Sequence, residues 1–167
     1  MKHFTSALFL VASFGLFGQN CTQPFISEYL EGSSNNKALE IVNPSSSPLN
    51  MSIYSISSFN NGNTSPTNTF QFPNITLPAN GVYVIANGNA DPSILSVSDT
   101  TSGVTWFNGD DAIVLFKNTD TLDIIGVVGT DPGTSWVVGS GATKEFTLVR
   151  KTTVQTGQTN WAIGAGE

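Results

Sequence analysis

The chain has 167 residues and carries six lysines and arginines against twelve aspartates and glutamates, a net charge of −6. This length suits one domain rather than two. Charged residues make up only 11% of the chain and apolar residues 39%, with 16 glycines and 8 prolines, a composition that excludes an acidic disordered chain and disfavours a helical one. The acidic balance also disfavours direct binding to nucleic acid, because such a surface repels phosphates.

The first 18 residues have the layout of a secretory signal peptide. Lys2 gives a positive tip, an apolar run fills residues 4–17, and Gly18 offers a small residue for cleavage. The run is too short for a comfortable membrane span. We therefore expect residues 1–18 to be removed, and the mature protein to be secreted or held at the cell surface without a membrane span.

A short lead-in over residues 19–23 contains Cys21, the single cysteine of the chain, so no disulfide can form within it. A cysteine just after a leader raises the question of lipid attachment. Gln19 and Asn20, which precede it, do not fit the small-residue site that lipidation needs. Because no cation next to Cys21 is expected to lower its pKa, we interpret it as an inert thiol.

From residue 24 to the end, short runs of apolar or alternating residues are separated by turn residues about every ten positions, which predicts an all-β sandwich or barrel. The first strand is expected over 25–30. A turn rich in Gly, Ser and Asn leads into the second strand, over 37–43. A third, half-buried strand is expected over 51–59, where polar and apolar residues alternate.

The middle of the chain continues this pattern. Phe70 and Phe72 share one face, and a turn follows at 78–81. The next run, 82–86, is apolar on both faces, so we expect it to be the most deeply buried strand. A polar loop is expected over 87–103.

The last third of the chain predicts a hairpin and one final strand. Residues 112–116 are as apolar as 82–86, and a reversal at 118–121 returns the chain through 122–128. An irregular loop, pinned by Trp136, is expected over 129–141. The final strand is expected over 145–151.

Several blocks, found in order over most of this region, resemble one family. They are residues 25–29, 31–41, 82–87, 107–115 and 147–151. The family is the lamin tail domain of bacterial proteins. The resemblance implies an immunoglobulin-like β-sandwich over residues 24–167, on secreted or surface proteins and often beside nucleases, phosphatases or other hydrolases. The related domain of nuclear lamins is a binding module.

One departure from the family pattern leaves two interpretations open. Family members usually continue past the Arg-Lys strand, through a segment with a tryptophan, to a closing strand, whereas this chain stops soon after Trp161. The chain is either a free-standing domain or the accessory part of an extracellular nuclease or other hydrolase truncated at its C-terminus.

The sequence offers little catalytic chemistry. Its single histidine, His3, lies in the expected leader, so the mature domain has no imidazole for a Ser-His-Asp or Cys-His arrangement. Asp110 and Asp111 are the candidates for a calcium site, because hard cations take carboxylate oxygens from loops. A turn-closing aspartate that accepts backbone N–H bonds explains the same motif and is the favoured interpretation. We expect no catalytic residue, no cofactor and no metal.

Three glutamates form a second acidic candidate. Glu28, Glu31 and Glu40 can in principle supply the acid and the nucleophile of a glycosidase. Glu28 and Glu40 lie on neighbouring predicted strands and can face each other. Carboxylates on the exterior of a sandwich are usually solvated, and Lys37 or Arg150 can neutralise either one, so a structural role is favoured over catalysis.

Large aromatic side chains are the remaining candidates. Flat rings that can stack on sugars are supplied by Trp106, Trp136, Trp161, Tyr29, Tyr54 and Tyr83. Such rings more often fill a core, and packing is favoured here. The sequence therefore predicts a secreted, non-catalytic module that binds a protein, a surface or a polysaccharide. The alternatives are an accessory domain of a hydrolase and a carbohydrate-binding module.

Overall fold

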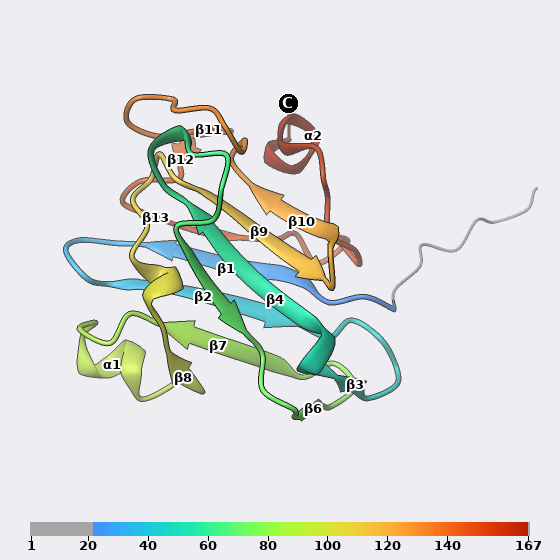
Figure 1. The fold of residues 1–167 in the computed structure, drawn as a ribbon. Coiled ribbons are helices and arrows are strands. Elements are labelled where there is room, and N and C mark those ends of the chain that lie inside the picture. Colours follow the sequence, from blue (N-terminus) through green and yellow to red (C-terminus); the bar gives the residue numbers. More distant parts are fainter. Residues whose placement is uncertain (1–21, 167) are drawn as a thin grey trace, which may run out of the picture.

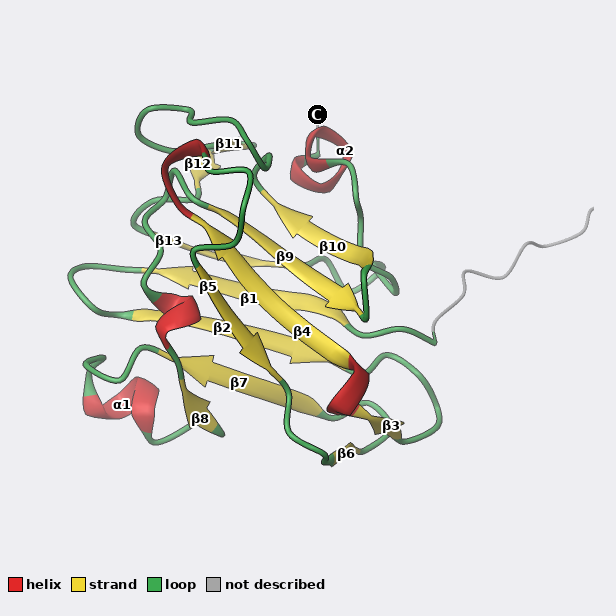
Figure 2. Ribbon diagram, in the orientation of Figure 1, coloured by secondary structure: helices red, strands yellow, loops and turns green. Residues whose placement is uncertain are grey.

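The computed structural model describes residues 22–166, and the expected leader and Cys21 lie outside the described residues. Within that part, two sheets pack face to face as a β-sandwich (Figure 1). The two short helices lie at the margins of the sandwich (Figure 2). The all-β prediction is therefore confirmed.

The first layer is a five-stranded sheet. Its strands are, in spatial order, β13 (Phe146–Val149), β1 (Phe25–Glu31), β2 (Lys37–Val42), β7 (Val82–Ala86) and β8 (Thr100–Thr101). Neighbouring strands are antiparallel, except that β8 runs parallel to β7. The first strand of the described chain therefore lies beside the last one.

The second layer is a four-stranded antiparallel sheet. It consists of β10 (Asp120–Ile125), β9 (Ala112–Lys117), β4 (Tyr54–Phe59) and β5 (Asn68–Gln71). The expected hairpin is present, because β9 and β10 pair directly across a tight turn. Asn118 occupies this turn with a φ of 52°, a left-handed conformation that asparagine tolerates better than most residues.

Shorter elements complete the described chain. Two two-stranded ribbons pair β3 (Leu49–Asn50) with β6 (Thr76–Leu77) and β11 (Val137–Val138) with β12 (Gly141–Ala142). The helices are α1 (Pro92–Leu95) and α2 (Trp161–Ala165), and single 3-10 turns cover Met51–Ile53, Asn60–Gly62 and Gly103–Thr105.

The main core lies between the two sheets. Alternate residues of each strand point into it, as the two-residue period of a strand requires. The buried residues of this cluster include Ile26, Tyr29, Leu39, Ile41, Tyr83 and Ile85 from the first sheet and Tyr54, Ile56, Ile113, Leu115 and Ile125 from the second. With the single cysteine outside the described residues, packing and backbone pairing hold the described sandwich together.

The structure corrects the prediction that 82–86 is the most deeply buried strand. Val82 at the start of β7 is 43% exposed, whereas four consecutive residues of β9, 112–115, are at most 2% exposed. The reason is position. β9 lies inside its sheet and a small apolar cluster covers its outer face, whereas β7 is bordered by the two-residue β8. An apolar run in the sequence indicates that both faces of a strand are covered by other residues, but it does not indicate how completely they are shielded from solvent.

Two further corrections concern local structure. The predicted strand 51–59 starts only at Tyr54, because the side chain of Asn50 accepts a 2.9 Å bond from the Ser52 N–H and caps a 3-10 turn. The expected polar loop at 87–103 contains α1 and β8. Pro92 occupies the first turn of α1, where its missing N–H costs no helical bond.

Candidate binding surfaces

A groove of about 250 Å³ lies on the outer face of the five-stranded sheet. Strands β13, β1, β2 and β7 form its floor, and one wall is formed by α1 together with Val97, two residues after the helix ends. The lining residues are Glu28, Leu30, Ala38, Glu40, Val84, Ser93, Ile94, Val97 and Thr147. The groove is smaller than the pockets that enclose drug-sized ligands, and its size suits a single side chain.

The wall of the groove is anchored at both ends. Before α1, the Asn36 side chain accepts a 2.9 Å bond from the Asp91 N–H and donates one of 2.9 Å to the Asp91 carboxylate. After α1, the Asp99 carboxylate accepts a 2.8 Å bond from the Val84 N–H. The turn before β2 and strand β7 therefore hold the wall in place.

The strand register divides the floor into two rows. In one row, Glu28 is directly opposite Glu40, and Glu40 is opposite Val84. In the next, Leu30 is opposite both Ala38 and Thr147. The floor therefore has an acidic row and, about 7 Å along the strands, a mostly apolar row.

The facing of Glu28 and Glu40, which the sequence suggested, is confirmed. Burial raises the pKa of Glu28 above its ordinary value of 4.5, and the nearby charge of Glu40 raises it further. The Ser27 hydroxyl donates a 2.7 Å bond to one carboxylate oxygen of Glu40. Among the described residues, none that lines the groove is a lysine, an arginine or a histidine, so the repulsion between the two carboxylates is uncompensated there.

Because these like charges oppose each other, Glu40→Gln is expected to raise the free energy of unfolding at pH 7 by about 0.5 kcal/mol, a small value set by solvent screening. The pKa of Glu28 is raised in the folded state, so the wild type loses stability as the pH rises from about 4 through that pKa. The gain should vanish below about pH 4. Urea unfolding at several pH values measures it.

The matched comparison for Glu40→Gln is a double-mutant cycle with Glu28→Gln. Each single change removes the same repulsion, so the double variant should gain less than the sum of the two. A gain that persists at low pH would contradict a charge origin.

The expected neutralisation by Lys37 or Arg150 is wrong for Glu28 and Glu40. Lys37 projects from the opposite side of β2 and forms a buried ion pair with Glu31. Arg150 Nη2 donates to Asp123 at 2.8 Å. The alternation of side chains along β2 separates Lys37 from Glu40, since odd and even residues point to opposite faces.

Asp123 organises a buried polar network at one end of the sandwich. Its side chain is fully buried, and it accepts bonds from the backbone N–H groups of Ile26, Ile124 and Gln158 at 2.9–3.0 Å in addition to the Arg150 bond. Burial raises the pKa of Asp123, and the Arg150 guanidinium and these N–H donors oppose that rise. The network joins β1, β10, the residue directly after β13 and the chain before α2.

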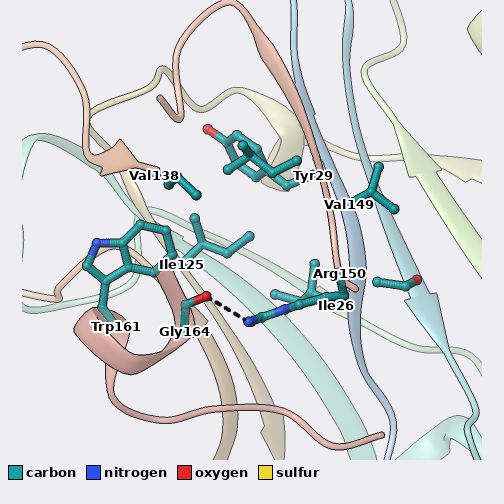
Figure 3. Close-up of a pocket in the computed structure, with 10 residues that line it drawn as sticks. Ile26, Tyr29, Ile125, Val138, Val149, Arg150, Trp161 and Gly164 are labelled. Atoms are coloured by element: carbon teal, nitrogen blue, oxygen red, sulfur yellow. Dashed lines mark hydrogen bonds between the residues drawn. The ribbon is translucent and has the colours of Figure 1, made fainter. Parts of the chain in front are cut away.

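A cavity of about 80 Å³ lies beside this network (Figure 3). Trp161 and Gly164 border one side of it, and Arg150 and Ile26 the other (Figure 3). Arg150 Nη1 donates a 3.2 Å bond to the Gly164 carbonyl, and Nε donates one of 3.4 Å to Ile26. Because protein acceptors engage the guanidinium on three of its nitrogens, Arg150 serves to attach α2 rather than to receive a ligand.

The calcium candidates Asp110 and Asp111 lie in the turn before β9. Both oxygens of Asp111 accept backbone bonds, from the Asn61 N–H at 2.8 Å and from the Asn108 N–H at 2.7 Å. Burial raises the pKa of Asp111, and these two bonds oppose the rise. The geometry therefore supports the turn-closing interpretation of Asp111. Among residues 22–166, no three Asp, Glu, His or Cys side chains gather closely enough to hold a metal ion.

The aromatic candidates separate into two groups. Tyr29, Tyr54 and Tyr83 are at most 8% exposed and lie in the core. Trp136 lies against Gly126, whose φ of 77° and lack of a side chain permit the contact, and its ring meets that of Trp161 edge-on at 6.3 Å. The loop pinned by Trp136 is present, although it contains β11 and the first residue of β12.

Trp106 is the exception, with 61% of its surface exposed. It follows the last 3-10 turn, and the next residue, Phe107, is fully buried. Of the three tryptophans, Trp106 is the one whose ring is mainly open to solvent.

Two other hollows are larger than the groove. One, of about 470 Å³, lies between the chain after β13 and α2. The other, of about 480 Å³, is a shallow depression over the four-stranded sheet, lined by Phe59, Thr64, Val114, Phe116, Thr121, Ile124, Val128 and Thr159. The depression has no charged lining residue among those described. Neither hollow combines an apolar floor with an uncompensated charge pair.

The two packed sheets, with their binding surfaces on outer faces and loops, define an immunoglobulin-like β-sandwich, a fold used by many binding domains. Its sequence matches the lamin tail domain family over residues 19–130, about two thirds of its length. The chain therefore belongs to the lamin tail domain family, which confirms the resemblance of the N-terminal blocks. No curated protein matches it.

The family match ends before the last described elements. The block 147–151, which resembles the family, lies beyond residue 130, yet β13 pairs with β1 over four residues and so belongs to the same sheet. No helix among residues 22–166 is long and apolar enough to cross a membrane.

Proposed function

We propose that the chain is an exported, non-catalytic interaction module that binds or tethers a partner protein through the groove on the outer face of its five-stranded sheet. One observation carries this proposal: the groove places an apolar row and an unneutralised carboxylate pair side by side, on a floor of paired strands and under an anchored wall. A site on paired strands is held more firmly than one on free loops.

The acidic pair supports the proposal in a second way. Facing carboxylates oppose folding, and a single change to glutamine would relieve the repulsion. Features that lower stability concentrate at functional sites, where binding compensates for them. The apolar leader supports export, and membership of a family of immunoglobulin-like binding domains supports an interaction role.

Selection of a phage-displayed library of random peptides tests the proposal. The bait is the mature protein, produced by export with its leader. Its first residue is expected to be Gln19. Thr147→Trp would lay an indole over Leu30 and fill the groove, so selected peptides should lose binding to this variant. Thr121→Trp is the matched control, because Thr121 lines the depression on the other sheet.

Retention of binding by Thr121→Trp and its loss by Thr147→Trp would support the groove. The proposal fails if no peptide is enriched, or if enriched peptides bind Thr147→Trp as tightly as the wild type. Loss of binding in Thr121→Trp alone would indicate that the interface lies on the four-stranded sheet instead.

A second candidate function, binding of a polysaccharide, is favoured by the exposed ring of Trp106. A glycan array run on the same preparations distinguishes it. This function would be supported if the wild type bound a glycan on the array and Trp106→Ala did not. If the wild type bound no glycan, the glycans on the array would be excluded as ligands.

A further inference from the structure

We propose that the groove receives the side chain of a lysine on a partner polypeptide, with its ammonium group between Glu28 and Glu40. Its aliphatic stem would lie along the apolar row formed by Leu30 and Ala38. The assignment rests on the proposed function, because it names the chemistry of the partner at the same groove.

Charge complementarity is the first argument. Glu28 and Glu40 are a directly opposed cross-strand pair, with Cβ atoms about 5 Å apart. Two carboxylates at this separation can both contact one small cation. Asp91 and Asp99, which precede and follow α1, add negative charge at the two ends of the wall. The described cations that pair with carboxylates, Lys37 and Arg150, are committed to Glu31 and Asp123.

The apolar row is the second argument, because it excludes a bare metal ion as the natural occupant. Leu30, Ala38 and Ile94 offer hydrocarbon but no ligand atoms beside the carboxylates. A cation on a flexible hydrocarbon stem satisfies both rows at once, since lysine buries its methylenes and keeps its charge at the tip.

The hydrogen bond of Ser27 favours lysine over arginine at Glu40. A guanidinium binds best as a planar fork that engages both oxygens of one carboxylate. One oxygen of Glu40 already accepts the Ser27 hydroxyl bond at 2.7 Å. An ammonium needs only one oxygen from each carboxylate and can direct separate N–H donors to Glu28 and Glu40.

NMR titration of the amide-labelled protein tests this assignment. The probe is a short peptide of glycines around one lysine, capped at both ends. Its counterpart has norleucine, which keeps the stem and removes the charge. We expect the lysine peptide to change the amide chemical shifts of residues on β1 and β2. The norleucine peptide should bind about tenfold more weakly. High salt should weaken binding of the lysine peptide.

The variants Glu28→Gln and Glu40→Gln should each weaken binding of the lysine peptide severalfold while remaining folded, because neither change is expected to lower stability. Asp120→Asn, on the four-stranded sheet and exposed, removes one negative charge away from the groove and is the matched control. Its affinity for the lysine peptide should equal that of the wild type.

Four results would overturn the assignment: no shifts with the lysine peptide, equal binding of the norleucine peptide, binding of an arginine peptide at least as tight, or tighter binding of the free diamine cadaverine. The last would indicate a small amine rather than a polypeptide. If random peptides still bind in a manner sensitive to Thr147→Trp, the proposed function stands and only the lysine assignment fails.

Discussion

Replacement of Asp123 by asparagine is expected to lower the free energy of unfolding by about 3–5 kcal/mol, the cost of breaking a buried ion pair. Asp123 is fully buried, and its two carboxylate oxygens accept hydrogen bonds from four donors. The asparagine amide keeps one acceptor oxygen and places an NH₂ group against donors. It also leaves the Arg150 guanidinium without its counter-charge. Urea denaturation followed by tryptophan fluorescence measures the change.

Asp120→Asn is the control for this change, since Asp120 lies on the same strand and is exposed. We expect less than about 0.5 kcal/mol from it. The 3–5 kcal/mol lost by Asp123→Asn would be a large fraction of the total stability of an ordinary domain. A loss below about 1 kcal/mol would show that the network adds little to the free energy of folding.

The second large effect is expected from Phe107→Ala, which should cost about 3–5 kcal/mol and lower the melting temperature by roughly 10 °C. Phe107 is fully buried and its ring stacks on that of Tyr29, with centroids 4.8 Å apart and planes inclined by 20°. The change would leave a cavity between the two sheets and remove the ring contact. Thermal unfolding monitored by circular dichroism tests it.

The adjacent Trp106→Ala is an unusually close control. It removes a larger ring one residue away, but that ring is 61% exposed. We expect a change within about 0.5 kcal/mol. Equal losses for the two variants would contradict the burial difference on which the prediction depends.

The strands were predictable because their signal is local. Alternation and turn residues located β1, β2 and the β9–β10 hairpin, and the boundaries shifted where a side chain competed with the ladder, as Asn50 does before β4. The relative burial of β7 and β9 was not predictable. It depends on the length of the neighbouring strands and on what covers the outer face of each strand, and neither is a property of a five-residue window.

The groove, like the fold, was predictable from the sequence only in part. The facing of Glu28 and Glu40 followed from two adjacent strands, but the wall did not follow from the sequence. The segment 87–103 reads as a polar loop, and α1 has only four residues. Its position depends on the Asp91 bond to Asn36, which spans 55 residues of sequence, and on the Asp99 bond to Val84, which spans 15. The Asp91–Asn36 pair could have been found only by a search for long-range contacts.

The pairing of β1 with β13 has a consequence for how the molecule comes to be folded. More than a hundred residues separate the two strands, so the first strand cannot complete its hydrogen bonds until residues 146–149 have emerged from the ribosome. Contacts between such remote segments slow the search for the native state. Under the export proposed above, a chain that stays unfolded while it lengthens would pass more readily through a narrow translocation channel, and β1 would pair with β13 only after β13 had crossed.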